Sequence, residues 1–96
     1  MNKYEIMFIV RPDIDEETRK KTVSALEKVL ASKKTTITLS KELGQMDFAY
    51  EIKKFKSGYY YLYNIESSES TATKEFDRVA RINENIVRHL ILKMED

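Results

Sequence analysis

The chain of 96 residues contains no cysteine, a single proline and only two glycines. Without cysteine it can form neither a disulfide framework nor a thiolate metal site, which agrees with a reducing cytoplasm. Its glycines, Gly44 and Gly58, cannot supply a glycine-rich phosphate-binding loop. No apolar run approaches the roughly 18 residues that a membrane helix needs, so we expect no membrane association.

An excess of charge of one sign is also missing. Seventeen lysines and arginines face sixteen acidic residues, giving a net charge of +1, whereas a domain that binds nucleic acid strongly often shows a basic excess. The chain is 42% hydrophobic and 34% charged, which is typical of a soluble globular protein. We therefore expect one domain over residues 1–96, and any nucleic-acid binding must use a local basic patch.

Hydrophobic periodicity predicts three elements and a hairpin in the first half of the chain. Residues 3–10 predict a strand that ends before Pro12, and residues 15–32 predict a helix. Asp13 and Asp15 are helix-starting residues, and Asp13 stands three places before Glu16, the spacing of a capping box. Strand patterns over 35–43 and 46–52 are separated by a bulge or bend at Gly44, and a hairpin loop is expected over 53–58.

The second half begins with the stretch GYYYLYNIE, residues 58–66. In a strand, alternate side chains face opposite sides of the sheet. We expect the set Tyr59, Tyr61, Tyr63 and Ile65 to face the helices, and the set Tyr60, Leu62, Asn64 and Glu66 to face away. A helix-capping region at 67–73, a short helix ending near Arg81, a turn at 83–85 and a strand at 86–93 complete the pattern.

The predicted order is therefore strand, helix, strand, strand, helix, strand. This order predicts an α+β fold of the ferredoxin-like, split βαβ kind (βαββαβ), with two helices on one face of a four-stranded antiparallel sheet. The other face of the sheet is then left open.

Residue patterns give no support for catalysis or metal binding. His89 is the sole histidine and alternates with Val87 and Ile91, so we expect it to pack at the boundary of sheet and helix. The acidic runs at 13–17 and 66–69 are explained by helix N-termini, and no serine or threonine stands in a nucleophile motif. We expect no catalytic residue, no metal and no cofactor.

Basic and aromatic residues on the open face suggest binding instead. Arginine or lysine beside exposed aromatics on an uncovered sheet is one form that RNA binding takes. We expect the open face and its rim to carry the RNA and partner contacts, with five leading candidates: Lys3, Tyr60, Leu62, Arg88 and Lys93. Charged residues interrupt the apolar members of this face, so we expect a monomer in isolation.

Three stretches resemble one known family: YEIMFIVRPDI at 4–14, ELG and FAYEIKKFKSGYYYLYNIE within 42–66, and INENIVRHLILK at 82–93. Together they resemble the bacterial small-subunit ribosomal protein six family over nearly the whole chain. The resemblance departs at Gln45, Met46 and Asp47, where the family often carries basic residues.

This resemblance implies a cytoplasmic, ribosomal protein that binds the central domain of 16S ribosomal RNA. It also implies a heterodimer with small-subunit ribosomal protein eighteen. If that partner is basic and neutralises many of the RNA phosphates, this chain needs only a local basic patch, which would account for its weak net charge. An acylphosphatase-like enzyme and a small-molecule regulatory domain of the same fold are the alternatives. The acidic, proline-containing VRPDIDEE after the first strand does not favour a phosphate cradle.

Overall fold

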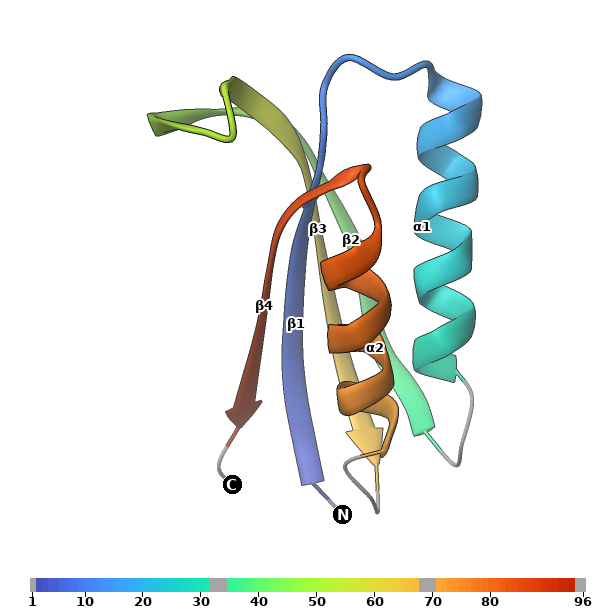
Figure 1. Ribbon diagram of the computed structural model, residues 1–96. Coiled ribbons are helices and arrows are strands. Elements are labelled where there is room, and N and C mark those ends of the chain that lie inside the picture. Colours follow the sequence, from blue (N-terminus) through green and yellow to red (C-terminus); the bar gives the residue numbers. More distant parts are fainter. Residues whose placement is uncertain (1, 32–34, 68–70, 95–96) are drawn as a thin grey trace.

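A computed structural model describes residues 2–31, 35–67 and 71–94. The elements are β1 (Asn2–Val10), α1 (Glu16–Ala31), β2 (Thr35–Ile52), β3 (Phe55–Ser67), α2 (Thr71–Ile82) and β4 (Ile86–Met94). All pairings in the four-stranded sheet are antiparallel, in the order β2-β3-β1-β4 (Figure 1). The predicted ferredoxin-like α+β fold is confirmed.

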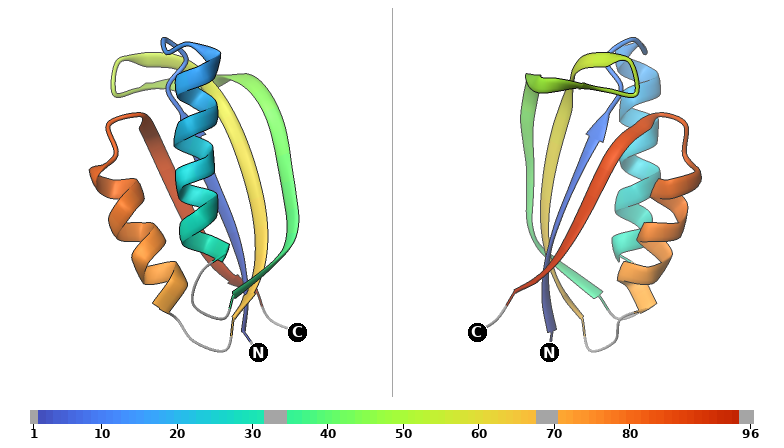
Figure 2. Two further views of the ribbon diagram at one scale, coloured as in Figure 1. Left: turned by 90° about the vertical axis from the view of Figure 1, so that its right-hand side faces the viewer. Right: turned by 60° about the vertical axis from the view of Figure 1, so that its left-hand side comes forward.

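The molecule has two layers. Both helices lie on the same face of the sheet, and none of the described elements covers the opposite face (Figures 1 and 2). At one end, the hairpin of β2 and β3 bends away from the helices, toward the side of the uncovered face (Figure 1). Neither helix in the described ranges is long and apolar enough to cross a membrane.

The core between sheet and helices is built around Phe8. Its ring stacks on Tyr61 and Tyr63 at centroid distances of 5.3 and 5.8 Å, and Phe76 of α2 meets it from the other layer at 5.8 Å. Leu26 of α1 is fully buried beside them. Three of the tyrosines predicted to face the helices therefore contribute to the core, Tyr59 by packing against it from a partly buried position.

The start of α1 differs from the predicted capping box. Asp15 caps the helix by accepting a hydrogen bond from the backbone N–H of Thr18 at 3.0 Å. Hydrogen bonding with the Thr18 side chain and then with its backbone lowers the pKa of the Asp15 carboxyl. Asp13 instead holds the guanidinium of Arg11, with 2.6 Å between Nε and Oδ1. The capping-box prediction was wrong because an arginine two residues away offers Asp13 a charged partner.

The hairpin between β2 and β3 is tighter than the six-residue loop predicted for 53–58. β2 runs continuously to Ile52, which pairs with Phe55, so the turn consists of Lys53 and Lys54. The bulge predicted at Gly44 is confirmed by a register shift there and a φ of 90°. The helix-capping region predicted at 67–73 lies partly outside the described residues.

His89 occupies the predicted boundary of sheet and helix. Its Nε2 lies 2.7 Å from Oδ1 of Asp77 on α2, and its ring meets Phe76 edge-on at 6.0 Å. The hydrogen bond from His89 holds the pKa of the Asp77 carboxyl below its ordinary value of 3.8. His89 thus joins β4 to α2.

This pair predicts part of the response to acid. Because the pKa of Asp77 is lower in the folded state than in the unfolded state, the ionised Asp77 carboxylate stabilises the fold above pH 3.8. This stabilisation is lost as the pH falls through the pKa that Asp77 has in the folded protein. We expect Asp77→Asn to lower the urea midpoint at neutral pH and to flatten the decline in stability on acidification. Urea titrations across this range measure it, and an unchanged acid limb would contradict it. The variant should still lose some stability on acidification, because the pKa values of Asp13 and Asp15 are also lowered in the folded state.

Candidate functional site

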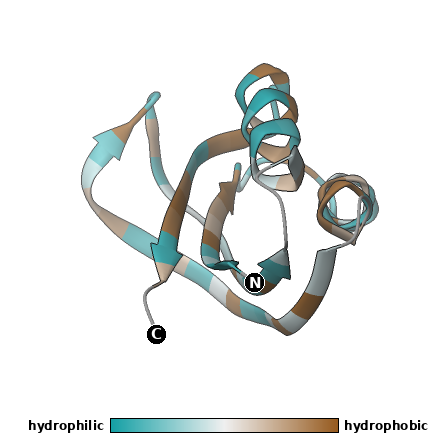
Figure 3. Cartoon of the chain, turned by 90° about the horizontal axis from the view of Figure 1, so that it is seen from below, coloured by the Kyte–Doolittle hydropathy of each residue, from teal (hydrophilic) through white to brown (hydrophobic). Residues whose placement is uncertain are grey.

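The open face is defined by strand pairing, because directly paired residues point to the same side of a sheet. Four rows cross it in the order β4, β1, β3, β2. They are Met94, Lys3, Glu66 and Thr36; Leu92, Glu5, Asn64 and Leu39; Leu90, Met7, Leu62 and Lys41; and Arg88, Ile9, Tyr60 and Gly44. The view along the strands in Figure 3 shows hydrophobic and hydrophilic segments alternating and the helices on one side only.

This face is more apolar than the sequence reasoning expected. Leu90 is 51% exposed, Leu92 48% and Met94 40%, all on β4, and Leu39 on the opposite edge strand is 40% exposed. The signal was in the sequence, since His89 facing the helices places every even-numbered residue from Arg88 to Met94 on the other side. An uncovered apolar band of this kind marks an interaction surface.

Four of the five predicted site residues lie on the open face. Tyr60 and Arg88 share a row beside Ile9, and Leu62 stands in the adjoining row. Lys3 lies at the far end of the face, where its Nζ is 3.9 Å from the Glu66 carboxylate. The structure therefore brings together Tyr60, Leu62 and Arg88 and leaves Lys3 apart.

Lys93 does not belong to the open face. It pairs with Tyr4, whose side chain is buried on the helix side, so Lys93 points to that side and is exposed at the end of β4. The spacing explains the difference: Arg88 and Lys93 are five residues apart, an odd number, and a strand places them on opposite faces.

Arg88 differs from the other arginines in its surroundings. Arg11 pairs with Asp13, Arg78 with Glu75 and Arg81 with Asp77, while Arg19 lies over the Tyr59 ring at 3.9 Å. Within the part of the chain that the structure describes, Arg88 has no carboxylate or ring partner. Its side chain is exposed and its charge is available to an external anion.

A hollow of about 360 Å³ lies beside Arg88, where the bent hairpin meets the sheet. Phe48, Tyr50, Ile52 and Tyr60 line it together with Arg88. The Phe48 ring meets Tyr60 edge-on at 6.1 Å. Gly58 permits this packing, since a Cβ there would lie 2.4 Å from Cγ2 of Ile9. The hairpin is thereby held against the row of Arg88.

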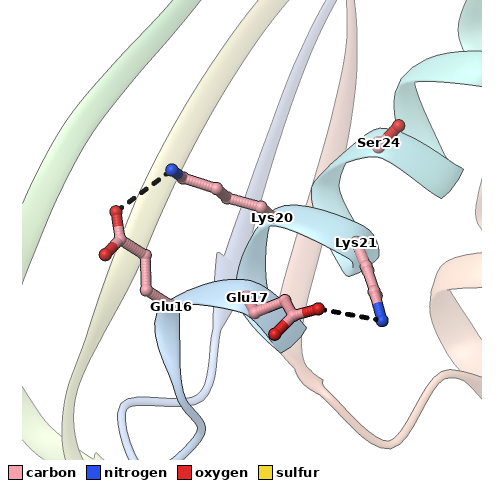
Figure 4. A pocket seen from close by; sticks show the side chains of 5 residues that line it. All are labelled: Glu16, Glu17, Lys20, Lys21 and Ser24. Atoms are coloured by element: carbon pink, nitrogen blue, oxygen red, sulfur yellow. Dashed lines mark ion pairs between the residues drawn. The ribbon is translucent and has the colours of Figure 1, made fainter.

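Another hollow, of about 400 Å³, lies on the outer side of α1 (Figure 4). It is lined by Glu16, Glu17, Lys20, Lys21 and Ser24, and the four charged side chains form the ion pairs Glu16–Lys20 and Glu17–Lys21 at 3.2 and 3.4 Å. Ion pairs between residues four apart are common on the solvent-exposed face of a helix. Nothing in this hollow converges on a ligand.

The described residues that follow β1 do not favour the alternative of an acylphosphatase-like site. The backbone N–H of Arg11, after β1, donates to the carbonyl of Asn85 at 2.9 Å, and the Arg11 guanidinium is held by Asp13. Among the described residues, no three side chains of histidine, aspartate or glutamate gather as metal ligands. The open face and the hairpin are left as the candidate site.

Comparison with known proteins agrees with this geometry. The sequence matches the family profile described as Ribosomal protein S6 over residues 3–93. The chain belongs to the ribosomal protein S6 family. The fold is similar to the crystal structure of 30S ribosomal protein S6 from Thermotoga maritima, with a TM-score of 0.91 and 30% sequence identity over 97% of this chain and 87% of that chain. The resemblance inferred from the sequence is confirmed.

Membership of the S6 family makes this chain a small-subunit ribosomal protein, in a family whose role is structural. The departure noted at Gln45, Met46 and Asp47 falls on β2 as it enters the bent hairpin. Met46 is 39% exposed and pairs with Gly58. In this segment the chain carries a polar, an apolar and an acidic side chain. Basic residues stand instead at the turn, Lys53 and Lys54, and at Arg88.

Proposed function

We propose that the chain binds the central domain of 16S ribosomal RNA as a heterodimer with small-subunit ribosomal protein eighteen, through the open face. The observation that carries the proposal is the exposed apolar band ending at the unpartnered Arg88. Leu90, Leu92 and Leu62 give a protein partner area to bury. Arg88 gives RNA phosphate one charge to contact.

The weak net charge of +1 supports a shared RNA interface. A protein that binds RNA alone needs many cations, because affinity grows with the number of phosphates neutralised. A basic partner seated on the open face would add its cations to Arg88. We expect the dependence of RNA affinity on salt to be shallow for this chain alone and steeper for the heterodimer.

The test is assembly with purified partner and a transcript of the 16S central domain. We expect Arg88→Ala to weaken RNA binding by the heterodimer without changing sequence preference, and to reduce the salt slope by about one. Arg78→Ala is the matched control, because Arg78 is an exposed arginine on α2, on the helix side. Assembly unchanged by Arg88→Ala would remove Arg88 from the interface.

We also propose that the isolated chain is a monomer. Lys3, Glu5, Glu66 and Arg88 stand among the apolar residues of the open face, so two copies would bring desolvated charges together. Sedimentation at micromolar concentration measures this, and a tight homodimer would contradict it.

A further inference from the structure

We propose that the tip of the β2–β3 hairpin is a second contact, which takes one unpaired RNA nucleotide. The hairpin tip is defined here as residues 47–57. The base of the nucleotide would stack on Tyr50 at the hollow beside Arg88. The phosphates on either side of the nucleotide would contact Lys53, Lys54, Lys56 and Arg88. The inference rests on the proposed function, since RNA is named as the partner, but apart from Arg88 it assigns residues outside the open face.

The first observation is the exposure of Tyr50. Tyr50 is 85% exposed, the highest value among the large hydrophobic residues described, and it lies within β2 where the pairing with β3 is irregular. Its neighbours Ala49 and Glu51 are also exposed. A tyrosine ring held on a strand with both faces accessible is a ready surface for a planar ring, and base stacking on aromatics tolerates any base.

The second observation is the pair of hollows that meet at this residue. Tyr50 lines both the hollow of about 360 Å³ beside Arg88 and a hollow of about 580 Å³ that includes Asp47 and Lys56. Glu51 lines both as well, so these hollows also contain a hydrogen-bond acceptor. An unstacked base offers donors on its edge to such an acceptor.

The third observation is the strained turn. Lys53 and Lys54 have φ angles of 49° and 70°, although the two-residue turn that connects such strands strongly prefers Asn-Gly. Lysine in this conformation costs stability, and strain of this kind accumulates at functional positions. A turn optimised only for folding would not carry two adjacent lysines here.

RNA fits this tip better than a protein segment does. The cations Lys53, Lys54, Lys56 and Arg88 outnumber the carboxylates of Asp47 and Glu51, in a chain whose net charge is only +1. None of these four cations forms an ion pair within the described residues. Arg11 lies over the Phe55 ring at 5.0 Å and so connects the end of β1 to the hairpin tip. The exposed ring of Tyr50 together with these unpaired cations suits a stacked base and its phosphates.

The test uses the absence of tryptophan from the chain. Tyr50→Trp introduces a single indole, which is titrated with a single-stranded RNA hexamer and, separately, with a duplex of the same sequence. We expect the hexamer to quench the indole and the duplex to have little effect, because its bases are already stacked. No quenching by the hexamer, or equal quenching by an acidic peptide of the same charge, would overturn the proposal.

Affinity for the hexamer, followed by a label on the RNA, separates the ring from the charges. We expect Tyr50→Ala to lower affinity roughly fivefold to a hundredfold and Tyr50→Phe to retain it. The double variant Lys53→Asn/Lys54→Gly is expected to raise the unfolding midpoint, because it relieves the turn, and to lower RNA affinity with a salt slope reduced by about two. A rise in stability with unchanged affinity would overturn the phosphate contacts.

Failure of this inference can be told from failure of the proposed function. If Tyr50→Ala leaves hexamer binding intact while Arg88→Ala still weakens central-domain assembly, the hairpin contact is overturned and the proposed function stands. If Tyr50→Ala abolishes hexamer binding while assembly with the partner does not respond to changes on the open face, the hairpin contact is supported and the proposed heterodimer interface fails.

Discussion

Leu90→Glu is expected to weaken formation of the proposed heterodimer about a hundredfold or more. Leu90 is 51% exposed on β4, an edge strand of the open face, beside Met7 and two strands from Leu62. Burying a leucine contributes about 1.5–3 kcal/mol, and an unpaired carboxylate in the same place opposes the contact further. Titration calorimetry of the purified chain with ribosomal protein eighteen measures the change.

Ile82→Glu is the matched control for this substitution. Ile82 is 71% exposed at the end of α2, on the helix side of the molecule, so it removes similar apolar area from a different surface. Both variants should unfold within about 0.5 kcal/mol of the parent chain, since neither side chain is buried. Equal partner affinity for both variants would place the partner elsewhere than the open face.

Ile65→Ala and Leu30→Ala are expected to lower the free energy of unfolding by about 2–5 kcal/mol each. Ile65 is 1% exposed on the helix side of β3, and Leu30 is fully buried in α1. Each truncation leaves a cavity between the two layers, where neighbouring rings such as Phe8 and Tyr63 cannot fully relax into it. Urea titration at neutral pH measures the shift in midpoint.

The folded fraction of these variants should still assemble with RNA and partner, because neither side chain reaches the open face. Leu62→Ala is the comparison, since it shortens a residue of the same strand that points the other way. We expect it to affect assembly more than stability. Losses below about half a kcal/mol for Ile65→Ala would mean that the two faces of β3 are reversed.

Most of the fold followed from periodicity. The six elements, their order and the inward set of β3 are local properties, because alternation in a strand and a spacing of three or four in a helix depend only on residue type. The family was also within reach of the sequence, since its recurring stretches cover 4–14, 42–66 and 82–93. For the candidate site, alternation correctly placed Tyr60, Leu62 and Arg88.

The errors arose where a residue's partner decides its role. Asp13 meets the charged Arg11, and Asp15 is left to cap α1. Ile52 pairs with Phe55, which shortens the predicted loop to Lys53 and Lys54. In each case the residue could adopt either of two local structures, and the residue that contacts it in the folded chain decides which one forms.

The sequence by itself determined which residues form strands and helices, which strand faces are apolar, and that one sheet face is left uncovered. Only the tertiary structure decided that the hairpin bends toward that face, placing Tyr50 and Phe48 beside Arg88, a residue nearly forty positions away in the chain. The physical reason is that sequence periodicity indicates on which side of a strand a side chain lies, but not how the strand bends. Register shifts such as those between Glu42 and Gly44 and between Asp47 and Ile52 bend the strand, and a bend depends on the packing of the whole sheet.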